Sequence, residues 1–356
     1  AKGKALEKKR EYKELNLYLD SIRLRIMKIQ RELEIEKVSV SANSVLDRFQ
    51  GKDAPVQRTL FEVFREHNDK CVQLSGTDMA PATVQRYETS LKHTRDFVWE
   101  TYHKKDVLLD EVSRQFIEDY EFWLKTEKKC CHNTATKYLK NFKKITRIAL
   151  AKGWMKNDPF LEIRFSLDKV EPDFLEDSEI QKLISKEIDI PRLSQVRDIF
   201  VFCCFTGLAF SDIHGLRKEH IVEDSNGVRW IRKGRQKTKI MCNIPLIEIP
   251  LKILEKYSTN EYCKKHGVLF PVLCNQKMNA YLKELADICG IKKTLTTHVG
   301  RHTFATFALA NGVSIESVAK MLGHTNVQMT RHYARVLDRT VIREMSQIKM
   351  DLHFSM

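Results

Sequence analysis

Residues 296–336 constrain this chain most, because they combine a helical pattern with four side chains that suit chemistry on a phosphate. His298 and Arg301 stand three positions apart, which places them on one face of a helix. His324 follows a second helical stretch, and Tyr333 comes nine positions later. A phenol is a weak nucleophile near pH 7, since its pKa is about 10. Cationic donors that bind a phosphate beside it stabilise both the phenolate and the transition state. The segment therefore predicts phosphoryl transfer without a metal.

The helix boundaries in this segment follow from capping residues. Thr297 is a candidate cap for a helix, and Ser314 is a candidate cap for the next one. Gly323 is expected to end that second helix, which leaves His324 just past a helix end. Thr325 or Asn326 is expected to cap a third helix that carries Tyr333. The apolar residues expected to pack inward are Phe304, Phe307, Ala308, Ile315, Val318, Ala319 and Leu322.

The spelling of three short motifs supports the same function. These motifs are residues 297–302 (THVGRH), 322–324 (LGH) and 332–333 (HY). They closely resemble the C-terminal boxes of tyrosine recombinases (phage-type integrases), and the similarity is nearest to integrases of conjugative transposons. The resemblance covers about residues 50–345. It implies that Tyr333 attacks DNA and that His298, Arg301 and His324 bind the scissile phosphate.

One position departs from the family pattern. Residues 206–213 (TGLAFSDI) resemble the first box, but the family usually has an arginine directly after Thr-Gly-Leu, and this chain has Ala209. The next three residues are Phe, Ser and Asp, which carry no guanidinium. Loss of one such phosphate donor is expected to cost several kcal/mol, by analogy with the roughly 2.7–4 kcal/mol lost with an oxyanion-hole donor. Either the enzyme is weakened or another cation replaces the arginine.

Residues 228–232 and 240–245 read as two strands of a hairpin with a cationic tip. Lys237 at the tip matches the family's hairpin lysine, which donates a proton to the 5′-oxygen leaving group. Arg235 stands two positions earlier and is expected on the same side of an extended strand. We hypothesise that Arg235 supplies the missing guanidinium. Lys239 and Arg232 are weaker candidates, and a merely solvated hairpin charge is the alternative.

Composition favours a soluble protein that binds nucleic acid. The chain has 356 residues and a formal net charge of +14. Basic residues outnumber acidic ones in each of residues 1–50, 51–170 and 171–356. Its nine cysteines show no disulfide or metal-ligand spacing, which is typical of reduced thiols in a cytoplasmic protein. The resemblance implies that this cytoplasm is bacterial. No membrane span or signal peptide is visible. The chain starts at Ala1 rather than Met, so we interpret it as a fragment or a processed protein.

Three parts are expected along the chain. Residues 1–50 comprise an N-terminal helix over 5–36 and most of a linker over 39–55, interpreted as the remnant of an arm-type DNA-binding domain. The helix has heptad-like spacing, so it either packs on a neighbouring subdomain or forms a coiled-coil dimer. Residues 51–165 are expected to form a helical core DNA-binding domain, with helices over 59–72, 83–102, 113–124 and 134–152. Residues 172–356 are expected to form a catalytic domain, with a helix capped by Asp177 or Ser178, a buried helix over 197–210 and a C-terminal amphipathic helix.

The helix predicted over residues 134–152 carries a basic stripe opposite its apolar face. This stripe is usually a solvated surface, but here it follows a clustered basic stretch, so we interpret it as a face that follows DNA phosphates. Its residues are Lys137, Lys140, Lys144 and Arg147.

The predicted fold is mainly α with a small β-hairpin or sheet, a helical core-binding domain and a mixed α+β catalytic domain. The predicted function is a site-specific recombinase or integrase of a mobile element. It would cut and rejoin double-stranded DNA through a 3′-phosphotyrosyl link, without cofactor, metal or ATP. The resemblance implies a homotetramer on DNA, with accessory DNA-bending proteins as further partners and no membrane. Two alternatives stay open: a recombinase-fold DNA-binding protein with weakened catalysis, and a type IB topoisomerase.

Overall fold

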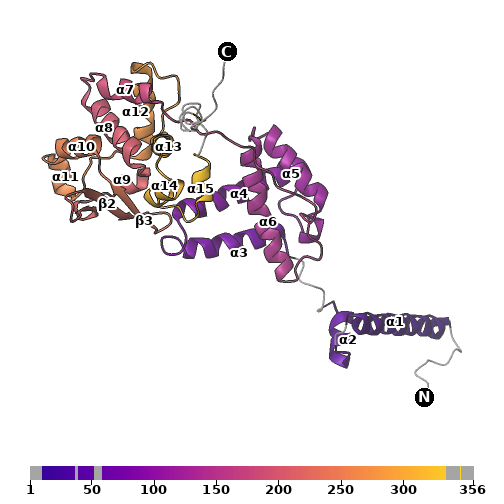
Figure 1. Ribbon diagram of the computed structural model, residues 1–356. Coiled ribbons are helices and arrows are strands. Elements are labelled where there is room, and N and C mark those ends of the chain that lie inside the picture. The colour runs from indigo at the N-terminus through magenta and orange to yellow at the C-terminus, as the bar shows by residue number, and fades with distance from the viewer. Residues whose placement is uncertain (1–9, 37–38, 52–57, 334–344, 346–356) are drawn as a thin grey trace, which may run out of the picture. The chain divides into compact units, whose positions relative to one another are not determined.

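The computed structural model describes residues 10–36, 39–51, 58–333 and 345. The chain divides into two compact units, residues 1–169 and 170–356 (Figure 1). The described residues are mostly helical and contain one three-stranded sheet, so the predicted fold class is confirmed. Every helix in the described ranges is too short or too polar to cross a membrane.

The N-terminal unit begins with a helical pair. Helix α1 (Arg10–Ile35) is followed by α2 (Ala42–Phe49), and the two helices contact each other. The sequence predicted a linker over residues 39–55, and that prediction is wrong where α2 forms. Ser41 starts α2, because its hydroxyl accepts the backbone N–H of Ser44 at 3.1 Å while the Ser44 hydroxyl accepts the N–H of Ser41 at 2.8 Å.

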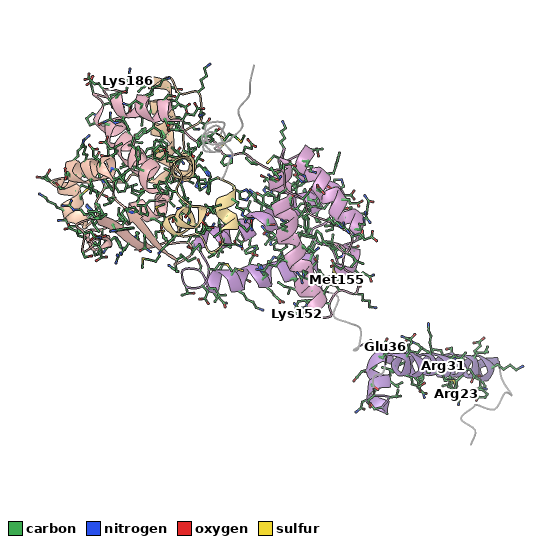
Figure 2. The ribbon with its side chains drawn as sticks, in the orientation of Figure 1. Arg23, Arg31, Glu36, Lys152, Met155 and Lys186 are labelled. Atoms are coloured by element: carbon green, nitrogen blue, oxygen red, sulfur yellow. The ribbon has the colours of Figure 1, made fainter. Side chains whose placement is uncertain are left out.

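Apolar and ionic contacts join these two helices. Leu33 of α1 is fully buried, and the Arg25 guanidinium lies 4.8 Å from the centre of the Phe49 ring on α2. Arg48 of α2 forms an ion pair of 2.9 Å with Glu36, which follows α1. Figure 2 labels Glu36 at this end of α1, with Arg23 and Arg31 along the helix.

The rest of this unit is helical, as predicted. Its helices are α3 (Leu60–Gln73), α4 (Pro81–Tyr102), α5 (Arg114–Thr126) and α6 (His132–Ala151), with a 3-10 turn η1 (Leu109–Glu111). The prediction placed the start of α4 at Thr83, two residues late. Pro81 occupies the first helical position, where its missing N–H costs nothing and its φ angle suits a helix.

Aromatic side chains fill the core of this bundle. The Phe97 and Phe116 rings meet edge to face at 5.1 Å, and Tyr120 and Phe142 complete the cluster. Phe142, Ile145 and Ala149 of α6 are fully buried on the predicted apolar face. Lys152 and Met155 follow α6 (Figure 2), and Met155 is buried again in the same core.

The C-terminal unit is built around α8 (Pro191–Thr206), a buried helix that contacts α7, α10, α12 and α13. Its remaining helices are α7 (Asp177–Ser185), α9 (Phe210–His214), α10 (Glu248–Tyr257), α11 (Glu261–His266), α12 (Asn275–Ile288), α13 (Thr297–Ala310), α14 (Ile315–Leu322), α15 (Gln328–Arg331) and the turn η2 (Lys218–His220). The sequence predicted one helix through Phe210. The chain instead leaves α8 at Gly207, whose φ of +67° ends the helix.

An antiparallel sheet lies in this unit, in the order β1 (Ile221–Glu223), β2 (Arg229–Gly234) and β3 (Met241–Pro245). The predicted hairpin corresponds to β2 and β3, and Ile231 pairs with Ile244 at its buried centre. The prediction missed β1. Three residues are too few to show an alternating pattern, so pairing with β2 decides this strand.

Three predicted caps are shifted by one or two residues. Val327 rather than Thr325 or Asn326 is the N-cap of α15, and Tyr333 lies two residues past the end of that helix instead of within it. Thr296 rather than Thr297 is the N-cap of α13, and Glu176 rather than Asp177 or Ser178 is the N-cap of α7. The predicted limits of α14 are confirmed: the Ser314 hydroxyl accepts the N–H of Ser317, and Gly323 ends the helix at a φ of +61°. The amphipathic helix predicted after Tyr333 lies outside the described residues, apart from Met345.

Replacement of Gly207 by alanine is expected to destabilise the C-terminal unit. A Cβ atom there would lie 2.4 Å from Phe304 Cδ1 and 2.8 Å from Leu322 Cδ2, and φ is positive. Left-handed strain and overpacking together are expected to cost about 2–4 kcal/mol. Gly227→Ala is the matched control, because its φ is +76° and no atom lies within 4 Å of the added Cβ. It should cost only the strain, about 1–2 kcal/mol. Urea denaturation followed by circular dichroism compares them, and equal losses would contradict the packing argument.

Candidate active site

Helix α13 carries two of the predicted site residues and lies close to α8. A Cβ atom on Gly300 would be 3.2 Å from Phe200 Cε2 and 3.3 Å from Cys203 Cβ, so a glycine suits this close approach. On the same helix, Arg301 is only 2% exposed, whereas His298 is exposed. The helix therefore brings a buried guanidinium and an accessible imidazole to one face.

Arg301 is held by the ends of two helices. Its Nη1 donates to the carbonyl of Gly207 at 2.7 Å, and its Nη2 donates to the carbonyl of Leu322 at 2.6 Å. These carbonyls stand at the C-terminal ends of α8 and α14, where partial negative charge favours a cation. Burial lowers the pKa of Arg301, and the positive charge of Arg235 lowers it further. Two like charges thus stand close together, an arrangement that favours an anion between them.

His324 follows α14 and is hydrogen-bonded on both ring nitrogens. Arg301 Nη2 donates to His324 Nε2 at 3.1 Å, and the Nδ1 atom lies 2.8 Å from the Thr330 hydroxyl oxygen. A guanidinium has no acceptor, so Nε2 holds the lone pair, and we assign the proton to Nδ1. Burial, then the charges of Arg301 and Arg235, lower the pKa of His324 to about 4. The ring is therefore neutral at pH 7.

Tyr333 lies beside this cluster and belongs to the same unit. It is 9% exposed and packs with Phe304 and Leu322. Its ring centre is 6.2 Å from that of His324, with the two planes within 12° of parallel, and 5.1 Å from the His302 ring. Tyr333 lies near Arg301, since the charge of the phenol raises the pKa of that guanidinium.

Arg235 reaches the same place from the end of β2. It is 9% exposed, its Nη1 donates to the Gly323 carbonyl at 3.5 Å, and its Nε lies 3.7 Å from a carboxylate oxygen of Asp212. Among the described residues, this Nε has no hydrogen-bond partner. The charge of Arg235 lowers the pKa of His298, Arg301 and His324, so the guanidinium lies near all three.

Gly323 makes room for Arg235. A Cβ atom at this position would lie 2.7 Å from Arg235 Cδ and 2.7 Å from Cys242 Sγ. The same glycine ends α14 and offers its carbonyl to both Arg235 and Thr238. Gly323 thus both ends α14 and leaves space for the Arg235 side chain.

The prediction that Arg235 and Lys237 point to one side of an extended strand is wrong. The strand ends at Gly234, and the chain then turns, with the N–H of Lys239 bonded to the carbonyl of Arg235 at 2.8 Å. The N–H of Gln236 donates to Asp212 at 2.9 Å. As a result Arg235 is buried, while Lys237 is exposed on the turn. Lys237 still stands near the cluster, since its charge lowers the pKa of His298.

The structure thus brings Arg235, His298, Arg301, His324 and Tyr333 together, with Lys237 beside them. The four predicted DNA-binding residues lie elsewhere, on α6 of the N-terminal unit, and all are exposed. Lys144 donates to the Tyr87 hydroxyl at 3.0 Å, and Lys140 lies 5.8 Å from the centre of the Phe165 ring. With Arg147, these two lysines line one groove, whereas Lys137 stands nearer the start of the helix.

Sequence reasoning missed Asp212, Thr330 and His302 as neighbours of the cluster. Asp212 was noted only as unable to replace a guanidinium, although a carboxylate inside an apolar box is a signal for a buried partner. Thr330 stands between His324 and Tyr333, where a hydroxyl suits a side-chain bond to either. The described residues contain no group of three or more His, Cys, Asp or Glu side chains placed to hold a metal ion, and all nine cysteines are free thiols.

The low pKa of His324 predicts a pH-dependent stability. The folded protein keeps this ring neutral down to about pH 4, whereas in the unfolded chain it binds a proton near pH 6.5. The unfolded state therefore gains protons first, and stability falls as pH drops below about 6.5. The full shift would lower the free energy of unfolding by about 2 kcal/mol between pH 7 and pH 5. The observed loss should be smaller, because solvent screens the partly exposed ring. Urea denaturation should give His324→Gln a shallower pH slope than the wild type. Equal slopes would contradict the lowered pKa.

The fold and this cluster define a class of protein with an integrase-type catalytic domain. Residues 173–340 match the model described as the phage integrase family, and residues 59–167 match the phage integrase SAM-like domain. A tyrosine recombinase of Pseudothermotoga lettingae is 29% identical over 265 residues, which cover 72% of this chain and 88% of the relative. The tyrosine recombinase XerD of Oceanobacillus iheyensis is 26% identical over 266 residues, covering 71% and 87%. The chain belongs to the phage integrase family of tyrosine recombinases.

Solved structures share the fold. The Tn1549 transposon integrase in complex with a circular intermediate DNA superposes with a TM-score of 0.63 at 18% identity, covering 82% of this chain and 99% of that one. A lambda integrase dimer bound to a COC′ core site gives a TM-score of 0.63 at 16% identity, covering 84% and 100%.

Proposed function

We propose that this protein is a site-specific DNA recombinase of a mobile element. It would cut and rejoin double-stranded DNA through a 3′-phosphotyrosyl intermediate. The observation that carries the proposal is the pair of buried guanidiniums of Arg235 and Arg301, which face His298 and His324 beside the ring of Tyr333. Two neighbouring guanidiniums favour binding of an anion between them. A DNA phosphodiester is an anion that the neighbouring phenol can attack. The family assignment and the DNA-bound relatives support the same substrate.

In the proposed reaction, the Tyr333 oxygen forms a bond to phosphorus while the bond from phosphorus to the 5′-oxygen breaks. Arg235 and Arg301 bind the non-bridging oxygens and stabilise the charge of the transition state, and His324 holds Arg301 in place by accepting a hydrogen bond from its Nη2 at Nε2. His298 accepts the phenolic proton. Partial burial and the charges of Arg301, Arg235 and Lys237 lower the pKa of His298, so the ring is neutral at pH 7 and can accept a proton. The new covalent bond retains the phosphodiester energy, so religation needs no ATP.

Arg235 is proposed to replace the arginine that the family usually has at the position of Ala209. Asp212, three residues after Ala209, lies 3.7 Å from Arg235 Nε and accepts the N–H of Gln236 in the same turn. The Arg235 guanidinium therefore lies beside residues 206–213, the segment that carries the phosphate-binding arginine in other family members. Burial in this position also fits a phosphate clamp better than a solvated hairpin charge.

Lys237 is proposed as the general acid that protonates the 5′-oxygen. Lys237→Ala should slow cleavage of ordinary DNA by about 100-fold or more, the range for a positioned proton donor. A substrate with sulfur in place of the bridging 5′-oxygen leaves as a thiolate, which needs no proton because its pKa is near 8.5. On that DNA the variant should approach the wild-type rate, as measured by covalent adduct formation. An equal loss on both substrates would remove Lys237 from this role.

The parts of the chain outside the active site are proposed to bind DNA and to assemble protomers on it. Lys137, Lys140, Lys144 and Arg147 on α6 are exposed and are proposed to contact DNA phosphates. Residues 1–50 are proposed as the remnant of an arm-binding domain, residues 51–165 as the core-binding domain and residues 172–356 as the catalytic domain. Joining two DNA molecules requires two protomers per crossover site and hence a tetramer, with DNA-bending proteins as accessory partners.

Selection of bound duplexes from a random-sequence pool gives a candidate site, and a nick near it then tests the chemistry. After cleavage the short strand diffuses away, so a covalent adduct accumulates and survives denaturant. The proposal expects this adduct in buffer containing EDTA and no nucleotide. Tight, salt-sensitive binding without an adduct would instead indicate a DNA-binding relative that lacks catalysis. Cleavage without any preferred sequence would indicate a topoisomerase.

A further inference from the structure

Thr330 links His324 to the nucleophile through two different groups. The side chain lies on α15 and is 0% exposed, with its hydroxyl oxygen 2.8 Å from His324 Nδ1. Its backbone carbonyl accepts the N–H of Tyr333 at 2.9 Å, and its own N–H donates to the carbonyl of Val327 at 2.8 Å. One buried residue therefore contacts both the imidazole and the turn that presents the phenol.

The hydroxyl has a specific task at the ring. Arg301 donates to Nε2, so the Nδ1–H group must find an acceptor in the same half-buried place. The Thr330 oxygen is that acceptor, and it selects the tautomer with the proton on Nδ1. Partners at both ring nitrogens also hold the plane of the imidazole, which lies within 12° of the Tyr333 ring.

We propose that Thr330 is the positioning residue of this site: its hydroxyl holds His324 in one tautomer and one plane, and its backbone ties that ring to Tyr333. This inference rests on the function proposed above. Because Thr330 is fully buried, it acts through His324 and Tyr333 rather than on the phosphate. The imidazole that holds Arg301 and the turn that presents the nucleophile are then fixed relative to each other.

Two substitutions at Thr330 separate the hydroxyl from the volume of the side chain. Thr330→Val keeps the shape and removes the acceptor, and Thr330→Ser keeps the acceptor with one methyl fewer. Thr325→Val is the matched control, because it makes the same change next to His324 at an exposed residue whose hydroxyl contacts only Met329 among the described residues. Thr330→Ala removes the hydroxyl without a branched side chain and replaces Thr330→Val if that variant does not fold.

Two readouts test the proposal on the full chain. Nitrogen-15 shifts of the histidine rings, with His324 assigned from His324→Gln, report the tautomer in the DNA-free protein. The rate of adduct formation on nicked DNA is measured with protein in excess, beside the affinity for the same DNA. For Thr330→Val we expect loss of the single Nδ1–H form and a rate 10- to 100-fold lower at unchanged affinity, as for lost orienting partners of metal-bound histidines. Thr330→Ser should stay within about threefold of the wild type, and so should Thr325→Val.

Two results would overturn the proposal. One is a Thr330→Val protein that keeps both the tautomer and the rate. The other is a Thr330→Ser protein as slow as Thr330→Val, because packing rather than the hydroxyl would then be responsible. A wild-type protein that forms no adduct would reject the proposed function. The nitrogen shifts need no activity, so they would still test whether Thr330 fixes the tautomer of His324.

Discussion

Tyr333→Phe is expected to abolish the covalent DNA adduct while DNA binding stays unchanged. The substitution removes only the hydroxyl, and the phenyl ring retains the contacts with Phe304 and Leu322 and with the His324 ring. Since the hydroxyl oxygen is the atom that attacks phosphorus, cleavage should fall on the order of 10⁴-fold or more, the scale of removing a catalytic nucleophile. Denaturing gels of wild type and variant on the same nicked duplex measure the loss.

Tyr262→Phe is the matched control for this experiment. Tyr262 is 52% exposed on α11, where its ring stacks on His266, and no part of the proposed site contacts it. It should form adduct at the wild-type rate. If Tyr333→Phe formed adduct as fast as this control, another nucleophile would have to be responsible.

Arg235→Ala is expected to produce the second largest effect. Removal of one preorganised donor to a developing negative charge typically costs 10²- to 10³-fold in rate, and we expect a loss of about that size here. Arg235→Lys should recover only part of it, because an ammonium does not present the two parallel N–H groups of a guanidinium. Single-turnover adduct formation compares these variants. Arg232→Ala is the control, since Arg232 lies three residues earlier, on β2, and is exposed.

A relocated arginine tests whether Arg235 replaces the residue missing at Ala209. In the Arg235→Ala background, Ala209→Arg restores the guanidinium to the position that the family pattern gives it. Partial recovery of the rate is the expected result, because the new side chain starts from the segment that Asp212 connects to Arg235. An Arg235→Ala protein with the wild-type rate would show instead that this side chain is only structural.

Local signals in the sequence were sufficient for the helices that carry the motifs. Ser314 and Gly323 bound α14 because a hydroxyl cap and a left-handed glycine act within a few residues. The apolar face of α6 was likewise correct, since the 3.6-residue period of a helix shows directly in the pattern. The caps of α7 and α13 were shifted because neighbouring residues of similar chemistry compete for one position.

The position of Arg235 could be guessed from the sequence only by elimination. Its burial depends on a turn that begins at Arg235 itself, on a bond from Gln236 to Asp212 and on a glycine 88 positions later. The last two of these contacts join residues far apart in the sequence. The same reason explains α2 and β1, which are short elements stabilised by a neighbour: α1 in one case and β2 in the other.

The most direct measurement is the identification of the residue that carries the DNA. Wild-type protein is allowed to accumulate adduct on nicked DNA, the adduct is digested with trypsin and nuclease, and the peptides are analysed by mass spectrometry. We predict a single modified peptide, with a nucleotide joined through its 3′-phosphate to the oxygen of Tyr333. A nucleotide on any other residue, or a link through a 5′-phosphate, would contradict the proposed mechanism.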